Sequence, residues 1–384
     1  MLKKKILFVI DSLDCGGAEK SLVTLLKFID YDQFEVELRL HSRGGLFEKL
    51  VPSEVSVRTV EIDKGWLGFN FIVARLFFFL LRCFNKNKHS SQLYWRSFKN
   101  CHKVLEKSFD IAIAYGQGFS TYYVADKVSA AFKYSWLNND YIKAGYDLSY
   151  DVPFYNQFKT IVVVSDENEE VFKKCYTAAG FNFSTIVIRD IVDEVEIFKK
   201  ASLSVDLIKN QSVFSITTVG RLTPQKGLNL AIEACKILVD HGKDIVWYVV
   251  GEGEERNVLQ ELIIKKGLSE NFILLGLKDN PYPYVFQSDL YVQSSIYEGL
   301  CITLIEAKLL QKPIVTTNFP SAYGIIEQDK TGIICEMNAV AIAQSIAKFM
   351  EDSSFMSAIV AHTKMDKNSD KEVSLERFKK LVQH

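Results

Sequence analysis

The stretch SSIYEGLCITLIEA, residues 294–307, decides how the rest of the chain is interpreted. It follows the apolar run 289–293 and leads into a helical pattern, so it joins a buried strand to a helix. Two carboxylates lie eight positions apart in it, Glu298 in the loop and Glu306 in the helix. An acid buried in an apolar helix needs a hydroxyl donor, and a ribose would supply one for Glu306. Alternatively, Glu306 is a solvated helix residue and Glu298 an acid at a helix start.

The start of this predicted helix also favours binding of an anion. The backbone amides of Gly299, Leu300 and Cys301 would lie at the helix N-terminus, where the helix dipole stabilises a phosphate. The stretch therefore predicts a site for a phosphorylated ligand that also carries hydroxyl groups.

A second such pattern lies upstream, in TTVGRLTPQKG, residues 217–227. A strand runs into Gly220, and two cations five residues apart flank a proline turn. Arg221 can form two parallel hydrogen bonds to a phosphate, and Lys226 supplies a compact point charge. The alternative is a solvated loop that carries two cations by chance.

The first predicted strand ends in glycines as well. In DSLDCGGAE, residues 11–19, Gly16 and Gly17 stand between the apolar run 6–10 and a helical run. Consecutive glycines let the backbone approach an anion at a helix N-terminus. Taken alone, the pair is equally compatible with a tight turn that binds nothing.

Short β-branched runs alternate with helical patterns along the whole chain, as in parallel sheets that helices cover on both faces. We predict two doubly wound α/β domains, residues 1–190 and 191–365, followed by a C-terminal helix, 366–384. The predicted strands of the two domains are 6–10, 35–40, 55–60, 110–115, 133–137 and 160–164, then 213–219, 245–250, 272–275, 289–293, 313–316 and 332–335.

Composition excludes several classes of protein. The chain has 384 residues, 48% hydrophobic and 24% charged, which is globular and neither disordered nor fibrous. Seven cysteines without a CxxC pair indicate neither a disulfide scaffold nor a zinc site. A net charge of −1 and the lack of a known nucleic-acid motif exclude nucleic acid as the expected partner. We expect no secretory signal and no membrane span, and hence a cytoplasmic protein.

One region departs from the balance of positive and negative charges in the rest of the chain. Residues 64–109 contain nine Lys/Arg and one acid, Glu106, interleaved with eleven aromatic residues. Such a composition suits the surface of an anionic bilayer, where each cation contributes about 1 kcal/mol. The prediction is peripheral association with the inner face of the plasma membrane. One alternative is a core helix beside a solvated basic helix. A nucleic-acid surface is a third, disfavoured interpretation, because no RNP, KH or helix-turn-helix pattern accompanies the charge.

Together the motifs resemble those of the retaining glycosyltransferases of family four, of the bacterial capsular and surface polysaccharide type. The resemblance spans roughly residues 5–350 and is tightest from 220 to 317. It implies the GT-B architecture, an α/β fold of two facing Rossmann-like domains with an interdomain cleft. The N-terminal domain would bind the acceptor and the C-terminal domain the nucleotide sugar. The motifs that carry it, in order, are Gly16-Gly17, Gly220-Arg221 with Lys226-Gly227, Gly251-Glu252-Gly253, Asn280 to Tyr284, and Glu298 with Glu306.

The resemblance also assigns roles to residues. It implies that Arg221 and Lys226 hold the donor diphosphate and stabilise the leaving nucleotide, with Glu298 near the reacting carbon of the sugar. Glu306 would bind the ribose. It implies no cofactor, since the nucleotide sugar is a substrate, and it favours a UDP-sugar over a GDP-sugar. The sequence lacks a DxD-type acidic pair at a strand end, so we predict no bound metal. The other donor-side residues are Gly16, Gly17, Gly220, Gly253, Leu277, Lys278, Gly299, Leu300 and Cys301.

The chain departs from the pattern of the family on the acceptor side. Many relatives carry a histidine where Asn138 stands here, and Asn138 can hydrogen-bond a sugar hydroxyl but cannot accept a proton. Gln117 stands where relatives often carry an acid, and Arg189-Asp190 replaces an Asn-Pro pair before the linker. These differences affect the acceptor side and leave the donor motifs intact.

The predicted function is transfer of a sugar, with retention, from a nucleotide-diphosphate donor to a lipid-linked saccharide in surface polysaccharide biosynthesis. Two alternatives stay open: a nucleotide-sugar epimerase of the same fold, and a non-catalytic sugar-nucleotide-binding membrane scaffold. A nicotinamide oxidoreductase is disfavoured, because Arg256 stands where the dinucleotide fingerprint after Gly251 needs a small residue.

Overall fold

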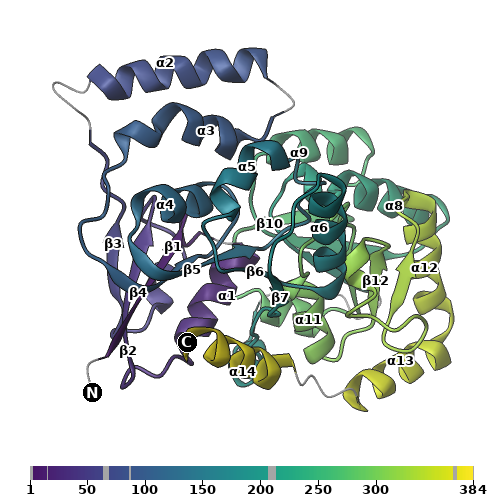
Figure 1. Cartoon of the computed structure of the whole chain (residues 1–384). Coiled ribbons are helices and arrows are strands. Elements are labelled where there is room, and N and C mark those ends of the chain that lie inside the picture. The colour runs from purple at the N-terminus through teal and green to yellow at the C-terminus, as the bar shows by residue number, and fades with distance from the viewer. Residues whose placement is uncertain are drawn as a thin grey trace. The chain divides into compact units, whose positions relative to one another are not determined.

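The computed structural model describes residues 3–14, 16–63, 69–85, 88–205, 213–365 and 370–383. The chain forms two compact units (Figure 1). The first comprises Met1–Ile191 and Asp370–His384, and the second comprises Val192–Ser369. Part of the basic aromatic region, residues 64–68 and 86–87, lies outside the described residues.

The first unit is built on a seven-stranded parallel sheet with the order β3-β2-β1-β4-β5-β6-β7. The buried parts of its central strands β1 and β4 are continuous apolar runs, as expected where helices cover both faces of a sheet. The strands are β1 (Lys4–Ile10), β2 (Phe34–Leu40), β3 (Ser56–Thr59), β4 (Phe109–Ala114), β5 (Ala130–Leu137), β6 (Thr160–Val163) and β7 (Thr185–Val187). The helices are α1 (Gly17–Leu26), α2 (Phe69–Phe84), α3 (Ser90–Phe98), α4 (Phe119–Lys127), α5 (Leu148–Tyr155), α6 (Asp166–Ala178) and α14 (Asp370–Gln383).

The second unit contains a six-stranded parallel sheet with the order β10-β9-β8-β11-β12-β13. The chain winds outward from β8 in one direction and from β11 in the other, so these adjacent strands form the topological switch point. The strands are β8 (Phe214–Val219), β9 (Ile245–Val250), β10 (Phe272–Gly276), β11 (Leu290–Gln293), β12 (Ile314–Thr317) and β13 (Ile333–Cys335). The helices are α7 (Glu194–Ala201), α8 (Leu228–Asp240), α9 (Arg256–Lys265), α10 (Tyr282–Gln287), α11 (Ile302–Leu309), α12 (Ala339–Glu351) and α13 (Ser353–Met365).

The predicted fold class, two doubly wound α/β halves, is confirmed, and every predicted strand is present with bounds that differ by a few residues at most. The sequence analysis missed one strand, β7. It has only three residues and pairs with β6 alone, at the edge of the sheet. Three residues are too few for a period of two to be recognised.

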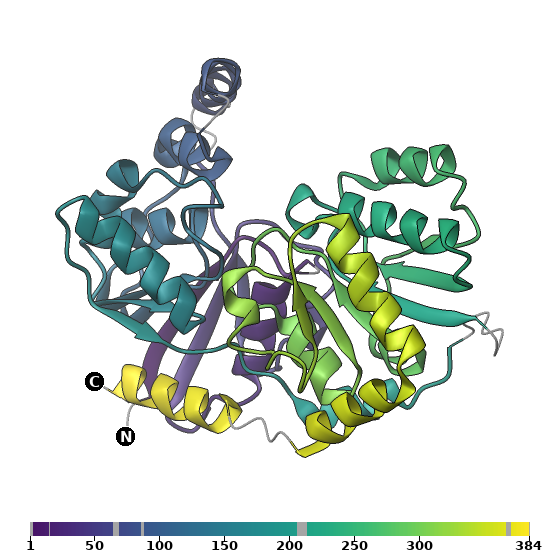
Figure 2. The same cartoon turned by 90° about the vertical axis from the view of Figure 1, so that its right-hand side faces the viewer.

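Helix α2 has an unusually exposed apolar surface. It packs on α3, where the rings of Phe71 and Phe78 lie 5.4 and 5.9 Å from that of Phe98. Figure 2 shows α2 end-on, beyond α3 as seen from the sheet. Only Ala74 of the helix is buried, and its exposed large side chains are Phe69, Ile72, Val73, Leu76, Phe77, Phe79, Leu80 and Phe84. Among the described helices, none combines the length and apolarity that a bilayer span requires.

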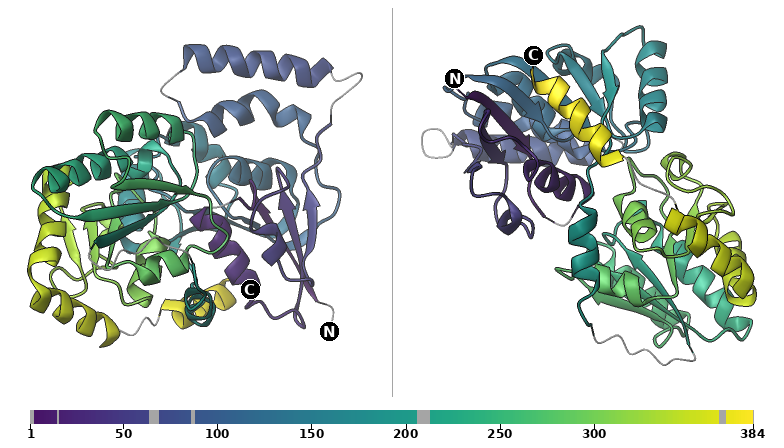
Figure 3. Two further views of the ribbon diagram at one scale, coloured as in Figure 1. Left: turned by 180° about the vertical axis from the view of Figure 1, so that it is seen from behind. Right: turned by 90° about the horizontal axis from the view of Figure 1, so that it is seen from below.

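The last helix, α14, packs on the first unit (Figure 3). The ring of Phe378 stacks on that of Phe8 in β1, with centroids 6.3 Å apart. Arg377 donates a hydrogen bond of 2.6 Å to the carbonyl of Val187 in β7. At the other end of the helix, Lys4 donates to the carbonyl of Gln383 over 2.8 Å. The polypeptide therefore returns to the first unit after completing the second.

Candidate active site

The loops that follow β8 and β11 meet in the second unit. In a parallel sheet, ligands bind beyond the carboxyl ends of the strands at the switch point, between the first strands that wind in opposite directions. The loop after β8 carries Arg221 and Lys226, and the loop after β11 carries Glu298. The backbone joins the two loops directly, because the amide of Ile296 donates to the carbonyl of Gln225 over 2.8 Å.

Lys226 and Glu298 form an ion pair at the centre of this site. The Nζ of Lys226 lies 2.6 Å from Oε1 of Glu298, and the two side chains are only 14% and 8% exposed. Burial alone would lower the pKa of Lys226, but the carboxylate of Glu298 outweighs it and raises the pKa. Lys226 is therefore a fixed cation in surroundings that contain little water, where electrostatic interactions are strong.

Two glycines shape the course of the lysine side chain. A Cβ on Gly220 would lie 3.2 Å from Cε of Lys226, so the stem of the lysine passes tightly over the backbone there. Gly227 has a φ of +58°, and a Cβ at this position would lie 2.3 Å from the carbonyl oxygen of Ser294. The left-handed backbone and the close approach both require glycine at position 227.

Glu298 is held by further donors. The hydroxyl of Ser295 donates to Oε1 over 2.6 Å, and Nε2 of Gln225 lies 3.3 Å from Oε2. The same Gln225 amide donates to the carbonyl of Tyr297 over 2.9 Å. The sequence analysis assigned no role to Ser295 or Gln225, although both lie inside the quoted motifs. Their proximity to Glu298 depends on how the two loops pack.

Glu306 lies on α11 and is 4% exposed. Its Oε1 accepts a hydrogen bond of 3.2 Å from the hydroxyl of Tyr282, the first residue of α10. Burial, together with the negative charge of Glu306, raises the pKa of Tyr282, so this hydroxyl stays protonated as a donor. The buried carboxylate therefore has a partner, and Tyr282 is a site residue to which the sequence analysis assigned no role.

Arg221 is exposed at the edge of the same loop, and its charge acts on Lys226 by repulsion. Two like charges held near each other favour an anion between them. Gly253 packs closely against the same loop, since a Cβ there would lie 2.3 Å from the carbonyl oxygen of Leu222. Leu277 is 44% exposed, and Nζ of Lys278 lies 5.9 Å from the centre of the Tyr284 ring.

The segment before α11 lies where the sequence analysis predicted it. Cys301 is the N-cap of the helix, directly after Gly299 and Leu300, and makes no side-chain cap hydrogen bond. The Cys301 side chain is buried. Burial, reinforced by the charge of Glu298, raises the pKa of the Cys301 thiol to about 12. This cysteine is therefore a neutral packing residue and not a nucleophile.

In the first unit, Gly16 is the N-cap of α1 and Gly17 its first residue. A Cβ on Gly16 would lie 2.1 Å from Oε2 of Glu19, so the carboxylate of Glu19 folds back over the start of the helix. The N-terminus of α1 thus already has an internal anion beside it.

Asn138 and Gln117 lie together after β5 and β4. Oε1 of Gln117 accepts from the amide of Asn138, and its Nε2 donates to the carbonyl of Asn139, each over 3.0 Å. The side chain of Gln117 therefore clamps the backbone of the loop. Nδ2 of Asn138 lies 3.4 Å from the carbonyl of Tyr115, and its buried Oδ1 has no hydrogen-bond partner among the described residues.

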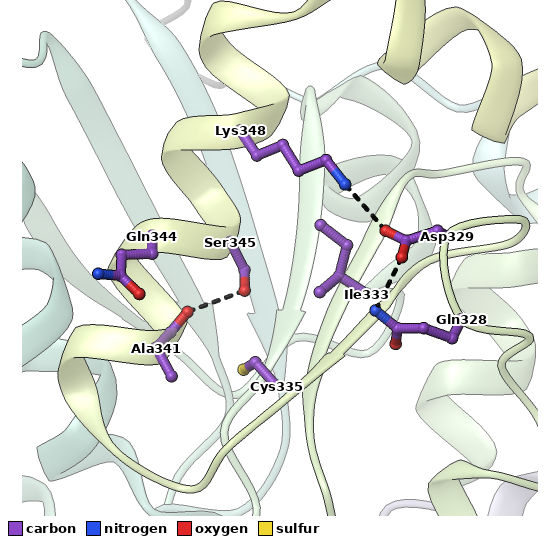
Figure 4. Close-up of a pocket in the computed structure, with 8 residues that line it drawn as sticks. All are labelled: Gln328, Asp329, Ile333, Cys335, Ala341, Gln344, Ser345 and Lys348. Atoms are coloured by element: carbon purple, nitrogen blue, oxygen red, sulfur yellow. Dashed lines mark hydrogen bonds and ion pairs between the residues drawn. The ribbon is translucent and has the colours of Figure 1, made fainter.

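The cavity drawn in Figure 4 is a different feature of the second unit. It has a volume of about 310 Å³ and lies between β13 and α12. Its polar side chains bind one another, with Lys348 paired to Asp329 over 2.9 Å and Gln328 donating to the same carboxylate over 3.3 Å. Its lining includes no residue of the loops after β8 and β11.

Within the described ranges, no three His, Cys, Asp or Glu side chains are close enough together to hold a metal ion.

Comparisons with known proteins find similarity to glycosyltransferases. The sequence model of the family "Glycosyl transferases group 1" matches residues 200–371, which contain both loops. An uncharacterised glycosyltransferase of Methanocaldococcus jannaschii is 32% identical over 171 residues, which are 43% of this chain and 41% of that protein. The capsular polysaccharide biosynthesis glycosyltransferase CapM of Staphylococcus aureus is 30% identical over 150 residues, 38% of this chain and 39% of CapM. The chain thus spans about two fifths of the length of these curated relatives.

Solved structures match along nearly the whole chain. HepE from Anabaena, in complex with UDP and glucose, has a TM-score of 0.70 at 20% identity, covering 98% of this chain and 95% of HepE. A mutant of S. aureus TarM, in complex with UDP and other ligands, has a TM-score of 0.72 at 14% identity, covering 99% and 100%. The fold is therefore GT-B. At these identities the structural likeness establishes the architecture of the chain and nothing further.

Proposed function

We propose that this chain is a glycosyltransferase that moves a sugar from a nucleoside-diphosphate donor, preferably a UDP-sugar, to a saccharide acceptor with retention of configuration. The ion pair between Lys226 and Glu298, at the switch point of the second sheet, carries this proposal. In this proposal the predicted domain 191–365, which lies within the second unit apart from residue 191, binds the donor, and residues 1–190 bind the acceptor.

The chemistry of the site suits departure of a nucleotide. When the bond between sugar and diphosphate breaks, negative charge develops on the leaving phosphate. Lys226 and Arg221 supply fixed positive charge there, which stabilises the transition state more than the ground state. These two side chains provide the neutralisation that a divalent cation would otherwise supply, so we propose a reaction independent of metal.

The remaining donor groups follow from burial and position. In this proposal Glu306, which is buried on α11 beside Tyr282, binds ribose hydroxyls. Glu298, paired with Lys226, contacts the sugar where it is attached to the diphosphate. Gly253, Leu277 and Lys278 line the proposed base pocket. The complex of HepE with UDP-glucose supports a UDP-sugar as the donor.

We propose a lipid-linked saccharide as the acceptor, with Asn138 hydrogen-bonded to one of its hydroxyls. One similar protein from Escherichia coli, 29% identical over 137 residues, is named for transfer to GlcNAc-diphosphoundecaprenol, which supports this class. CapM supports a role in surface polysaccharide biosynthesis.

We also propose that α2 docks the chain peripherally on the inner face of an anionic membrane. Its exposed apolar residues, among them Leu76 and Phe79, would enter the interface, while Arg82 and Lys88 meet the lipid head groups. The protein leaves most apolar side chains of α2 exposed to water, and insertion into the lipid interface would bury them.

Calorimetry tests the donor site. Purified protein is titrated in EDTA with UDP, GDP, ADP and their sugars, next to Glu306→Ala and the control Glu336→Ala, which removes an exposed acid of the second unit. We expect one nucleotide to bind, with affinity at least about tenfold weaker in Glu306→Ala and unchanged in the control. If no nucleotide binds to any form, or if binding requires a divalent cation, the donor site is wrong as proposed.

Flotation with phosphatidylglycerol vesicles tests the membrane surface. Leu76→Ser combined with Phe79→Ser, and separately Arg82→Glu, should release most of the bound protein, whereas Lys174→Glu on the exposed face of α6 should not. Equal flotation of all four proteins, or equal binding of the unmutated protein to neutral vesicles, would contradict docking on an anionic surface by α2.

A further inference from the structure

A chain of buried side chains leads from the middle of β11 to the proposed catalytic pair. The hydroxyl of Tyr291 lies 2.7 Å from Oε1 of Gln293, whose Nε2 lies 2.8 Å from the hydroxyl of Ser295. Ser295 in turn lies 2.6 Å from Oε1 of Glu298. Tyr291, Gln293 and Ser295 are each 0% exposed. No function discussed so far requires three polar side chains in this part of the core.

The direction of these hydrogen bonds is fixed from the charged end. Glu298 is paired with Lys226 and acts as an acceptor only, so the single hydrogen of the Ser295 hydroxyl must point at Oε1. Ser295 must then accept from Gln293, and only the amide nitrogen of Gln293 can donate. The amide oxygen is left to accept from Tyr291 and from Thr303, which lies 3.3 Å away.

The two oxygens of the Glu298 carboxylate differ in their hydrogen bonds: Oε1 has two short contacts and Oε2 has one long contact. Oε1 of Glu298 receives Ser295 and Lys226, both at 2.6 Å. Oε2 has Gln225 at 3.3 Å, a much weaker contact. The backbone of Ser295 is itself held, because the hydroxyl of Thr317 in β12 donates to its carbonyl over 2.5 Å.

We propose that Gln293 and Ser295 are positioning residues for the reaction, which hold Glu298 on Lys226 by Oε1 and present Oε2 to the sugar. They act through Glu298 and do not touch the substrate themselves. Buried polar networks are costly unless every member is satisfied, and here Gln293 and Ser295 each have a partner on both sides, so the network holds the carboxylate before the donor binds. The inference rests on the proposed function for its effect on turnover, though not for its effect on Lys226.

Four variants separate positioning from general packing. Ser295→Ala removes the last donor, Ser295→Thr keeps a hydroxyl, and Gln293→Glu keeps the shape while removing the amide donor. Ser321→Ala is the matched control, since Ser321 is equally buried in the same unit and its hydroxyl has no partner among the described residues. Each protein is tested for melting temperature, affinity for UDP in EDTA, and kcat and KM for donor turnover.

We expect Ser295→Ala and Gln293→Glu to lower kcat about tenfold or more, with UDP affinity within about twofold of the unmutated protein. Ser295→Thr should recover most of the rate, and the control should change nothing. If Ser295→Ala keeps full kcat, the proposal fails. It fails equally if UDP affinity and melting temperature fall in proportion to kcat, because that result indicates packing alone.

A second readout does not depend on turnover. Competitive acetylation with acetic anhydride, followed by mass spectrometry, measures how firmly Lys226 is held in its pair. We expect Ser295→Ala to raise the acetylation rate of Lys226 several-fold and the control to leave it unchanged. If the unmutated protein binds no nucleoside diphosphate and turns over no donor, the proposed function is wrong, while this measurement still decides whether Ser295 holds the pair. An unchanged acetylation rate in Ser295→Ala overturns the positioning role.

Discussion

At the scale of single residues, the site depends on one charged pair that is largely shielded from water. Lys226 and Glu298 each carry a full charge that the other compensates. Removing one partner of such a pair leaves an uncompensated charge with little solvent, which costs more than the pair itself contributes. The pair is therefore coupled in stability as well as in chemistry.

A double-mutant cycle measures this coupling. We expect Lys226→Met to lower the free energy of unfolding by about 3 kcal/mol, and Lys226→Met with Glu298→Gln to regain a substantial part of the loss. Both variants should lose about 10²–10³-fold in donor turnover. Urea unfolding at neutral pH gives the stabilities of the double variant and of Lys226→Met and Glu298→Gln alone. Strict additivity of these two single changes would exclude the coupling.

Gly227 gives a second prediction at this scale. Gly227→Ala combines a left-handed backbone with a Cβ 2.3 Å from a carbonyl oxygen, whereas Gly242→Ala has a similar φ of +73° and open space. Both changes carry backbone strain of about 1 kcal/mol or more, but only the first displaces the loop after β11. Thermal unfolding should rank Gly227→Ala clearly below Gly242→Ala, and equal melting temperatures would contradict the close approach.

The sequence predicted the charged residues of the second unit and missed what holds them. Lys226 and Glu298 could be found because phosphate chemistry needs such groups beside glycines at a strand end. Gln225 and Ser295 are ordinary polar residues in the same motifs, and only the packing of two loops distant in sequence brings them to Glu298. The structure shows that Lys226 and Glu298 form an ion pair, and their catalytic roles are proposals.

At the scale of elements, α5 shows how a buried acid joins helices. Asp151 on α5 is 1% exposed and accepts hydrogen bonds from Gln92 on α3, Tyr122 on α4 and Tyr141, over 2.6 to 2.8 Å. Burial raises the pKa of Asp151 to about 6, although its three donors act in the opposite direction. Packing of these helices is therefore sensitive to pH.

The sign of this effect follows from proton binding. The native state holds the proton of Asp151 more tightly than the unfolded state, so this group contributes most stability below about pH 4 and loses it as the pH rises through about 6. Relative to Asp151→Asn, the unmutated protein should lose about 2 kcal/mol of stability between pH 4 and pH 7.5. Urea titrations at several pH values test this.

Asp147, the N-cap of the same helix, provides a control of opposite sign. Hydrogen bonding from Ser149 lowers the pKa of Asp147, so its contribution is present at neutral pH and lost as the pH falls below about 4. Asp147→Asn should therefore cost stability at neutral pH and not in acid. A stability difference for Asp151→Asn that is flat with pH would show that Asp151 does not titrate in this range.

The secondary-structure elements were predicted more completely than any other feature, and the two exceptions are β7 and the exposure of α2. Strands such as β9 read clearly because sheets covered on both faces need continuous apolar runs. Strand β7 was missed because its three residues gain their structure from β6 and from α14. The apolar run in α2 was recognised, but whether it would be buried could not be read from composition.

At the scale of the whole molecule, the two units differ in continuity: one is a single segment of the chain and the other combines two segments. The second unit is the continuous segment Val192–Ser369. The first unit, in contrast, contains α14, which begins at Asp370, after the whole second unit. Arg189, just before the crossing, pairs with Asp370 over 3.0 Å and with Asp166 over 2.5 Å. The first unit is therefore incomplete without its last helix.

Removing α14 should destabilise one unit only. A truncation after Met365 exposes Phe8 and the edge strand β7, and we expect calorimetry to show an earlier transition for the first unit and an unchanged one for the second. The variant Phe378→Ala should shift the same transition by a smaller amount, equivalent to about 3–4 kcal/mol. A single transition that moves as a whole would mean that the two units unfold together.

The return of α14 has a consequence during synthesis on the ribosome. Domains usually fold in the order in which they emerge, from the N-terminus onward. Here residues 192–369 can complete their fold while the first unit, although made earlier, still waits for its final helix. Nascent chains interrupted before α14 would contain a finished second unit and an unfinished first unit. Their exposed Phe8 surface would mark them for chaperones and proteases, so the cell can recognise an unfinished copy.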